Sequence, residues 1–257
     1  MPSDAAQART RRWPWALGGV IGVISLAVGV LASGAVDVDR IEFTGLHRVS
    51  FDEAIEAVSI RAGDAMPLVD TSEAEESLQK LPWIDNARVR RRWPGTVEVE
   101  ITERRAIALA LQAPQTWVLV DTEGRVLTGA LADPPKLPRL SGIHAAPAAG
   151  DFLSDDADSM LEVVEALSAA HGLVIESVWR DQRGDLRARL RVLAQHAYLE
   201  VILGDNSAIA AKSAAVATVV GKLSETAQTG TDDADISELD VSVPRLPVLR
   251  TGSEARP

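Results

Sequence analysis

The chain has 257 residues, no cysteine and a formal net charge of −11 at pH 7. The lack of cysteine excludes disulfides and thiolate metal sites, and the acidic balance argues against a general binder of nucleic acid or anionic lipid. Hydrophobic residues make up 46% of the chain and aromatic residues 4%. A buried core would therefore consist mainly of Ala, Val, Leu and Ile.

An uncharged, largely apolar run covers residues 13–36 and follows a short basic segment. A helix of about 20 apolar residues crosses a hydrocarbon core of about 30 Å, and basic residues before it place the N-terminus in the cytoplasm. The predicted anchor residues are Arg11, Arg12, Trp13 and Trp15. We expect a cytoplasmic tail at 1–12, a transmembrane helix at 13–36, and a single-pass type II protein of the plasma membrane whose bulk is extracytoplasmic.

Two export signals are alternatives to this anchor. A cleavable signal peptide also has a basic start, an apolar stretch and small residues at its end, and residues 33–35 offer such small residues. The arginines at 11 and 12 are also compatible with a twin-arginine signal. Both alternatives leave the bulk of the chain outside the cytoplasm.

Residues 37–105 read as strand, helix, helix, strand, strand. A short alternating strand ends at Gly45, and Ser50 followed by Glu53 is typical of a capped helix start. Phe51, Ile55 and Val58 recur at helical spacing and predict its buried stripe. A second helix begins near residue 70 or 72 and ends before Pro82.

The last two strands of this segment form a predicted hairpin with the three-residue loop 93–95. A two-residue loop would put charge on the apolar face, whereas the longer loop places Gly95 where a left-handed residue is expected. The resulting register pairs Arg92 with Thr96, Arg90 with Glu98, and Arg88 with Glu100. Such exposed pairs contribute at most about 1 kcal/mol each, so the arginine cluster is interpreted as a solvated sheet face.

The rest of the chain alternates strands with two helices. Asp121 opens a turn at 121–124, and a turn role is preferred over a catalytic one. Met160, Leu161, Val164 and Leu167 give the apolar stripe of a helix over 154–171. The remaining expected elements are strands near 173–179, 185–193 and 197–204, a helix over roughly 207–223 that contains Lys212, a flexible loop at 225–235, and a last strand at 236–243.

Several runs resemble the FtsQ/DivIB cell-division proteins. Residues 81–89, 92–97 and 99–104 resemble the POTRA domain of that family, and residues 117–126, 137–140, 203–212 and 236–250 resemble its second domain. The resemblance implies an α+β fold with a βααββ POTRA domain at 37–105. It further implies an FtsQ-type β domain at 106–250 with a mostly antiparallel sheet and a C-terminal edge strand, followed by a disordered tail at 251–257.

The resemblance also implies a function. Such proteins are non-enzymatic bitopic scaffolds of the division machinery that bind FtsL and FtsB (DivIC) and so influence septal peptidoglycan synthesis. In the family the last strand binds the FtsB partner, and strand addition at a free sheet edge is the physical means. The matching residues here are Leu239, Asp240, Val241, Ser242 and Val243.

No catalytic or metal-binding constellation is apparent in the sequence. The histidines His47, His144, His171 and His196 lack ligand spacing, and neither a nucleophile elbow nor a phosphate-binding glycine loop is present. We therefore expect no cofactor, no nucleic acid and no small-molecule substrate. A POTRA-bearing export component and an anchored envelope enzyme are the alternative functions.

Overall fold

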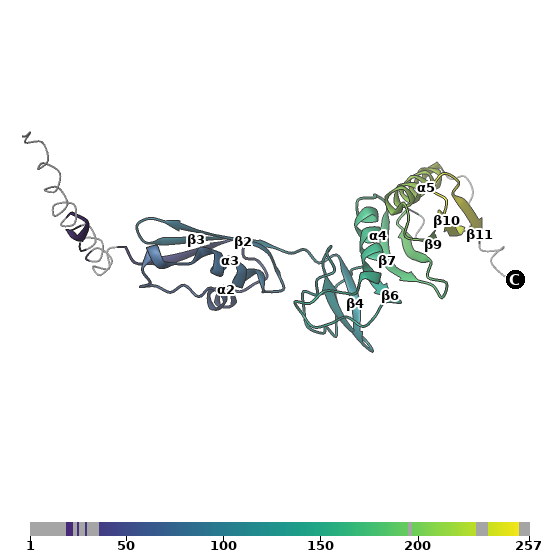
Figure 1. The fold of residues 1–257 in the computed structure, drawn as a ribbon. Coiled ribbons are helices and arrows are strands. Elements are labelled where there is room, and N and C mark those ends of the chain that lie inside the picture. The colour runs from purple at the N-terminus through teal and green to yellow at the C-terminus, as the bar shows by residue number, and fades with distance from the viewer. Residues whose placement is uncertain are drawn as a thin grey trace, which may run out of the picture. The chain divides into compact units, whose positions relative to one another are not determined.

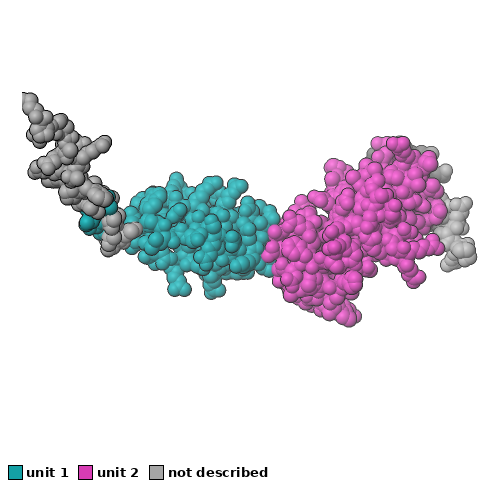
Figure 2. Space-filling view, viewed as in Figure 1, with its two compact units in different colours: residues 1–103 teal, residues 104–257 magenta. Residues whose placement is uncertain are grey.

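The computed structural model describes residues 36–194, 197–229 and 236–251, together with 19–22, 25 and 29. Within these residues no helix has the length and apolarity needed to cross a membrane. Most of the predicted span at 13–36 and all four predicted anchor residues, Arg11, Arg12, Trp13 and Trp15, lie outside the described part. The chain divides into two compact units, residues 1–103 and 104–257 (Figures 1 and 2).

Unit 1 is a three-stranded sheet with two helices on one face (Figure 1). Its elements are β1 (Arg40–Thr44), α2 (Phe51–Ala57), the 3-10 helix η1 (Met66–Leu68), α3 (Thr71–Gln79), β2 (Ile84–Arg92) and β3 (Thr96–Glu103). The strand order is β1-β3-β2, with β1 parallel and β2 antiparallel to β3. Alternate residues of the central strand, Val97, Val99 and Ile101, are buried against the helices.

The helix starts of unit 1 follow the predicted caps. The Ser50 hydroxyl accepts from the backbone N–H of Glu53 at 3.1 Å, and the Asp70 carboxylate accepts from Ser72 and Glu73 at 3.0 Å each. Each acceptor satisfies an N–H that has no partner within the first helical turn. The predicted buried stripe of α2 is wrong in part, because Phe51 is exposed and the helix turns Ala54 and Val58 toward the core.

The predicted register of the β2–β3 hairpin is confirmed. Arg88 lies opposite Glu100, Arg90 opposite Glu98, and Arg92 opposite Thr96. The expected conformation of Gly95 is wrong, since its φ is not positive. Space favours glycine there: a Cβ would displace the exposed Asp39 carboxylate and lie 3.0 Å from the backbone oxygen of Asp37.

Unit 2 is an eight-stranded mixed sheet. Its elements are β4 (Ala108–Ala113), β5 (Thr116–Val120), β6 (Arg139–Ser141), η2 (Asp155–Ala157), α4 (Asp158–Ser168), β7 (Leu173–Arg180), β8 (Leu186–Val192), β9 (Ala197–Gly204), α5 (Ile209–Thr229), β10 (Ile236–Asp240) and β11 (Val248–Thr251). The strand order is β11-β10-β9-β8-β7-β6-β4-β5. Helices α4 and α5 pack together over one face of the sheet (Figure 1), and the predicted stripe of α4 is fully buried there.

Two buried ionic groups hold loops of unit 2 in place. Asp121 is 2% exposed; it accepts from the N–H groups of Glu123 and Arg125 and from the Arg104 guanidinium at 2.7 Å. This is the predicted turn role. Lys212 on α5 is 1% exposed, and its ammonium donates to the carboxylate of Asp205 at 2.6 Å and to its backbone oxygen at 2.9 Å.

The C-terminal part of the sheet corrects two predictions. Helix α5 continues to Thr229, so the part of the expected loop at 225–229 is helical, and residues 230–235 lie outside the described part. The segment 236–243 is not the edge strand, because β11 follows β10 and pairs with it antiparallel. The reversal begins at Asp240, whose carboxylate accepts from the backbone N–H and the hydroxyl of Ser242 at 2.9 and 2.7 Å.

Candidate partner-binding edge

The outermost strand at the C-terminal side of the unit 2 sheet is β11. It pairs with β10 on one side, from Asp240↔Val248 to Ile236↔Thr251. Within the described part of the chain, no strand pairs with its other side. A free strand edge presents a row of N–H and C=O groups that an added strand satisfies. This edge is therefore the candidate site for a partner.

Apolar side chains are exposed on this edge and on the turn that leads into it. Leu249 is 43% exposed and Val248 is similarly accessible, although both lie in a regular strand. Val243 and Leu246 on the preceding turn are more exposed still, and the turn is closed by the Leu246 N–H, which donates to the Val243 oxygen at 3.0 Å. We call these four residues the edge patch.

The residues predicted from the sequence to bind the partner are divided by the structure. Leu239 and Val241 are fully buried in the core. Leu239 also has neighbours on both sides, Val201 of β9 and Leu249 of β11. Asp240 caps the turn, Val243 belongs to the edge patch, and Ser242 is exposed beside it. Only these last two are accessible to a partner at the edge.

Sequence reasoning missed β11 itself. The signal was a short apolar pair, Val248 and Leu249, after Pro247. Four residues with a proline before them carry too little alternation to predict a strand on their own. Residues 248–251 are a strand because they pair with β10.

The face of the sheet opposite α4 and α5 is covered with ion pairs. Arg187 on β8 bridges Asp181 at 3.1 Å and Glu200 at 2.9 Å, and Arg191 pairs with Glu176 at 3.2 Å. Partial burial lowers the pKa of Arg187, but its hydrogen bonds to Glu200 and Asp181 outweigh that effect and raise the pKa. The guanidinium therefore stays charged and fixed on this face.

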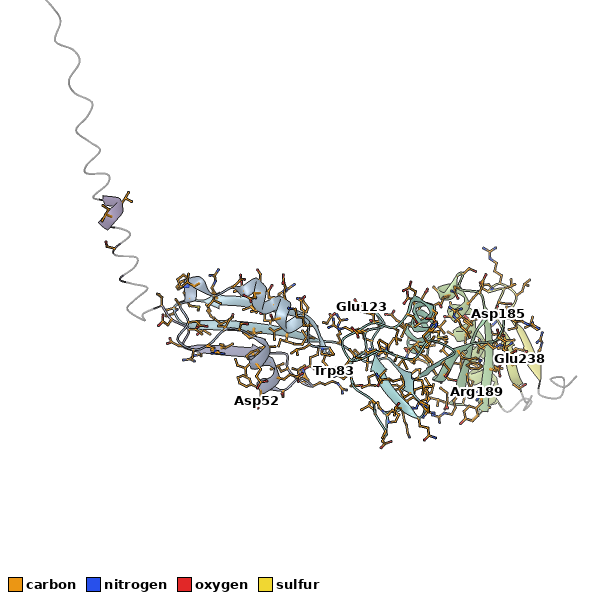
Figure 3. The ribbon with its side chains drawn as sticks, turned by 60° about the horizontal axis from the view of Figure 1, so that its bottom comes forward. Asp52, Trp83, Glu123, Asp185, Arg189 and Glu238 are labelled. Carbon is orange, nitrogen blue, oxygen red and sulfur yellow. The ribbon has the colours of Figure 1, made fainter. Side chains whose placement is uncertain are left out.

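Near β10 this charged face holds a shallow pocket of about 400 Å³, lined by Glu176, Arg189, Tyr198, Glu200 and Ser237. Figure 3 shows Arg189 and Glu238 on neighbouring parts of the sheet. Glu238 pairs with Arg250 of β11 at 2.6 Å. Ion pairs thus continue across the sheet to its free edge, and a partner seated at the edge would meet charge of both signs.

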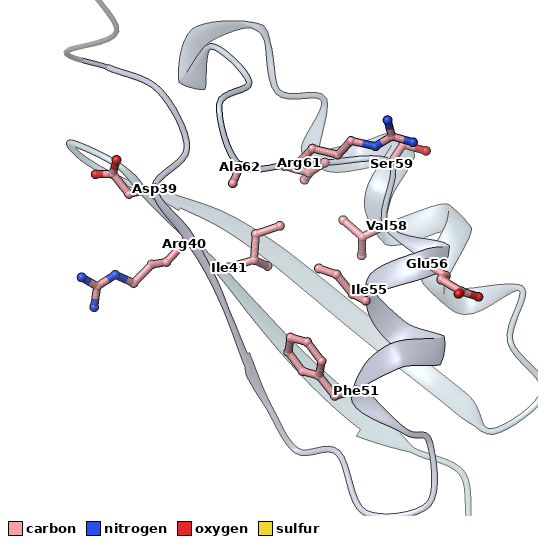
Figure 4. A pocket seen from close by; sticks show the side chains of 11 residues that line it. Asp39, Arg40, Ile41, Phe51, Ile55, Glu56, Val58, Ser59, Arg61 and Ala62 are labelled. Carbon is pink, nitrogen blue, oxygen red and sulfur yellow. The ribbon is translucent and has the colours of Figure 1, made fainter.

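A second accessible surface lies on unit 1, between β1 and α2. This groove has a volume of about 720 Å³, and Ile41, Phe51, Ile55 and Val58 supply its apolar lining (Figure 4). Phe51, which the sequence predicted to be core, is 54% exposed here and contacts the ring of Phe43 edge-on at 5.3 Å between centroids. The groove borders β1, which pairs with β3 alone among the described strands.

Within the described ranges, no group of three or more His, Asp or Glu side chains is arranged to hold a metal ion. His196 lies outside those ranges. Of the other histidines, His47 contacts the Gly45 oxygen at 2.9 Å and His144 contacts Asp156 at 3.4 Å. These are local contacts on the surface.

Sequence comparison assigns both units. The sequence model for the FtsQ-type POTRA domain matches residues 36–104, and the model for the C-terminal domain of the cell division proteins FtsQ and DivIB matches residues 108–242, just over half of the chain. The chain belongs to the FtsQ/DivIB family of cell division proteins. The expected resemblance is thereby confirmed for both units.

Curated relatives carry the description cell division protein FtsQ. One, from Corynebacterium glutamicum, is 29% identical over 164 residues, which are 62% of this chain and 70% of that protein. Those from Bordetella pertussis and Zymomonas mobilis are each 34% identical, over 42% and 52% of this chain. The alignments cover 39% and 40% of these two proteins, so the match spans well under half of their length.

Proposed function

We propose that this family member is a non-enzymatic scaffold of the division machinery, anchored by residues 13–36 with its N-terminus in the cytoplasm. The two units then stand outside the cytoplasm at the division septum. There they bind FtsB-type (DivIC) and FtsL-type partners and help to control septal peptidoglycan synthesis. Membership of the FtsQ/DivIB family supports the role in division, and the uncharged run supports the anchor.

One observation carries the binding proposal: none of the described strands pairs with the outer side of β11, and apolar side chains are exposed along it. A partner strand added to β11 would extend the sheet and cover Val248 and Leu249. The other two residues of the edge patch, Val243 and Leu246, lie on the turn before β11 and enlarge the contact toward the roughly 800 Å² per partner of a specific interface. The strand proposed for pairing is therefore β11, with Ser242 and Val243 as flanking contacts.

A matched pair of leucine substitutions tests this edge. Leu249 is 43% exposed on β11 and Leu193 is 46% exposed beyond the end of β8. We expect Leu249→Lys to weaken capture of an FtsB-type partner at least about tenfold, because apolar burial is lost and a charge is desolvated. Leu193→Lys should leave capture unchanged.

Capture is measured by titrating the labelled extracytoplasmic part of the partner onto full-length protein in detergent. Equal affinity of both lysine variants would remove β11 from the interface. Leu239→Lys is a poor probe, because that side chain is fully buried and its loss of binding would report unfolding.

The division role is tested in cells. Depletion of the protein should give filaments or branches without septa, and a copy with Leu249→Lys should restore division less well than the wild type. Septation at the normal rate after depletion would contradict the proposal. The non-enzymatic role is tested separately, by incubating the purified chain with peptidoglycan and measuring released fragments.

A further inference from the structure

Residues 36–39, which precede β1, are hydrogen-bonded to other segments at one end of the unit 1 fold. The backbone oxygen of Val36 accepts from Met66 at 2.9 Å, and Val38 is bonded to both Asp64 and Gly63 at 2.8 and 2.9 Å. The N–H of Asp39 donates to Gly95 in the β2–β3 loop at 2.7 Å. Residues 36–39, which follow the predicted span, are therefore fixed by backbone hydrogen bonds to the segment before η1 and to the hairpin loop.

Two large apolar side chains are exposed at this end. Trp93 in the hairpin loop is 57% exposed, and Leu68 in η1 is 78% exposed. Neither belongs to the core of unit 1. The Arg91 guanidinium donates to the backbone oxygens of Met66 and Pro67, at 3.5 and 3.3 Å, and so ties the hairpin to η1. Trp93 and Leu68 therefore belong to the two segments, the hairpin loop and η1, that hold residues 36–39.

The distance along the chain to a membrane is short. The predicted span ends at Val36, and three residues reach at most about 11 Å from there to Asp39. The headgroup region extends about 5–8 Å beyond the hydrocarbon on each side of a bilayer. Tryptophan is enriched in that region, where its ring is apolar and its N–H stays hydrated. Both exposed side chains thus come within reach of the headgroups.

We propose that Trp93 and Leu68 insert into the headgroup region of the bilayer and fix this end of unit 1 on the membrane. The inference rests on the proposed membrane anchor. Its partner is a phospholipid surface rather than a specific anionic headgroup, because the two exposed side chains are apolar and the charged residues beside them are of both signs, with Arg92 next to Trp93 and Asp39 hydrogen-bonded to Gly95 of the same loop. Apolar insertion, not charge, supplies the attraction.

The chain contains no cysteine, so single labels are introduced cleanly into the full-length protein. Leu68→Cys carries a fluorophore in one sample and Phe51→Cys in the other, since Phe51 is also exposed but lies at the other end of β1 from Asp39 (Figure 4). Both proteins are reconstituted in phosphatidylcholine vesicles that contain a lipid with a nitroxide on its headgroup. We expect the label at 68 to be quenched several-fold more than the label at 51.

A substitution at Trp93 distinguishes insertion from mere tethering. Trp93→Ser should lower the quenching of the label at 68 several-fold if Trp93 holds this end of unit 1 in the headgroup region. A tethered but unattached unit would show the same quenching with and without Trp93, and that result would overturn the proposal. Strong quenching only when phosphatidylglycerol is added would also overturn it, in favour of electrostatic attraction.

Flotation of the vesicles separates this inference from the anchor on which it rests. Protein that fails to float with the vesicles refutes the anchor at 13–36. Protein that floats while the label at 68 is quenched no more than the label at 51 refutes only the contact by Trp93 and Leu68.

Discussion

Replacement of Asp121 by Ala tests whether this carboxylate is structural. Asp121 is 2% exposed and accepts three hydrogen bonds, from the N–H groups of Glu123 and Arg125 at 3.0 and 2.8 Å and from the Arg104 guanidinium at 2.7 Å. Removing one partner of a buried ion pair costs about 3–5 kcal/mol. Arg104 keeps its contact with the Glu123 carboxylate at 2.8 Å, so we expect a loss of about 3 kcal/mol, at the low end of that range.

Unit 2 has about 150 residues, for which 1 kcal/mol shifts the Tm by about 2–4 °C. Asp121→Ala should therefore lower the Tm of unit 2 by about 6–12 °C, measured by scanning calorimetry of the full chain in detergent. The control is Glu123→Gln, which removes an exposed partner and should cost at most about 1 kcal/mol. An unchanged Tm with Asp121→Ala would refute the structural role, and lost division at an unchanged Tm would point to a functional one.

Three further outcomes follow from groups with defined partners. Hydrogen bonds from Lys212 and Ser207 lower the pKa of Asp205 to about 2. The contribution of Asp205 to stability is therefore complete above about pH 4 and disappears as the pH falls through 2. Unfolding measured across an acid titration should show this pH dependence, and Lys212→Met should reduce it. Burial raises the pKa of Glu103, but the N–H groups of residues 47–49 outweigh that effect and lower it; Glu103→Gln should destabilise unit 1 by about 2 kcal/mol in calorimetry near neutral pH, and less in acid. Gly95→Ala should lower the stability of unit 1 by about 1–3 kcal/mol, because the added methyl group comes too close to Asp39 and Asp37. An unchanged Tm would show that the β2–β3 loop or the Asp39 side chain moves to accommodate the methyl group.

Local patterns predicted the β2–β3 hairpin well. Its alternation of arginine with apolar residues admits one register that keeps charge off the core, and the structure has that register. The reason for Gly95 could not be predicted, because it depends on Asp39, which lies more than fifty residues earlier and reaches the loop only through the pairing of β1 with β3. Sequence spacing describes neighbours along the chain and not those brought in by another strand.

The same limit explains the error at the sheet edge. Leu239 and Val241 alternate with polar residues and are buried, as that alternation indicates. Alternation shows which face of a strand is covered, but it does not show whether another strand lies beside it. The position of β10 between β9 and β11 depends on four residues after Pro247, which are too few to predict a strand.

Helix α2 shows how far helical spacing can be relied upon. Phe51, Ile55 and Val58 do share a side of the helix, yet the helix is rotated so that Ala54 and Val58 meet the sheet. A small residue at 54 lets the helix approach closely, and the bulky Phe51 is left at the rim of the groove. Which part of a wide apolar stripe becomes core is decided by the volume available beneath it.

The parallel pairing of β10 with β9 has a consequence for the order of assembly. Parallel strands need a connection that returns to the starting end of the sheet, and α5 lies in the connection between β9 and β10. Among the described strands β11 pairs with β10 alone, so its place in the sheet depends on that connection. A chain in which β10 has not paired with β9 does not present the outer side of β11 to a partner. A partner that adds a strand to β11 would therefore bind only molecules in which the C-terminal part of the unit 2 sheet is folded.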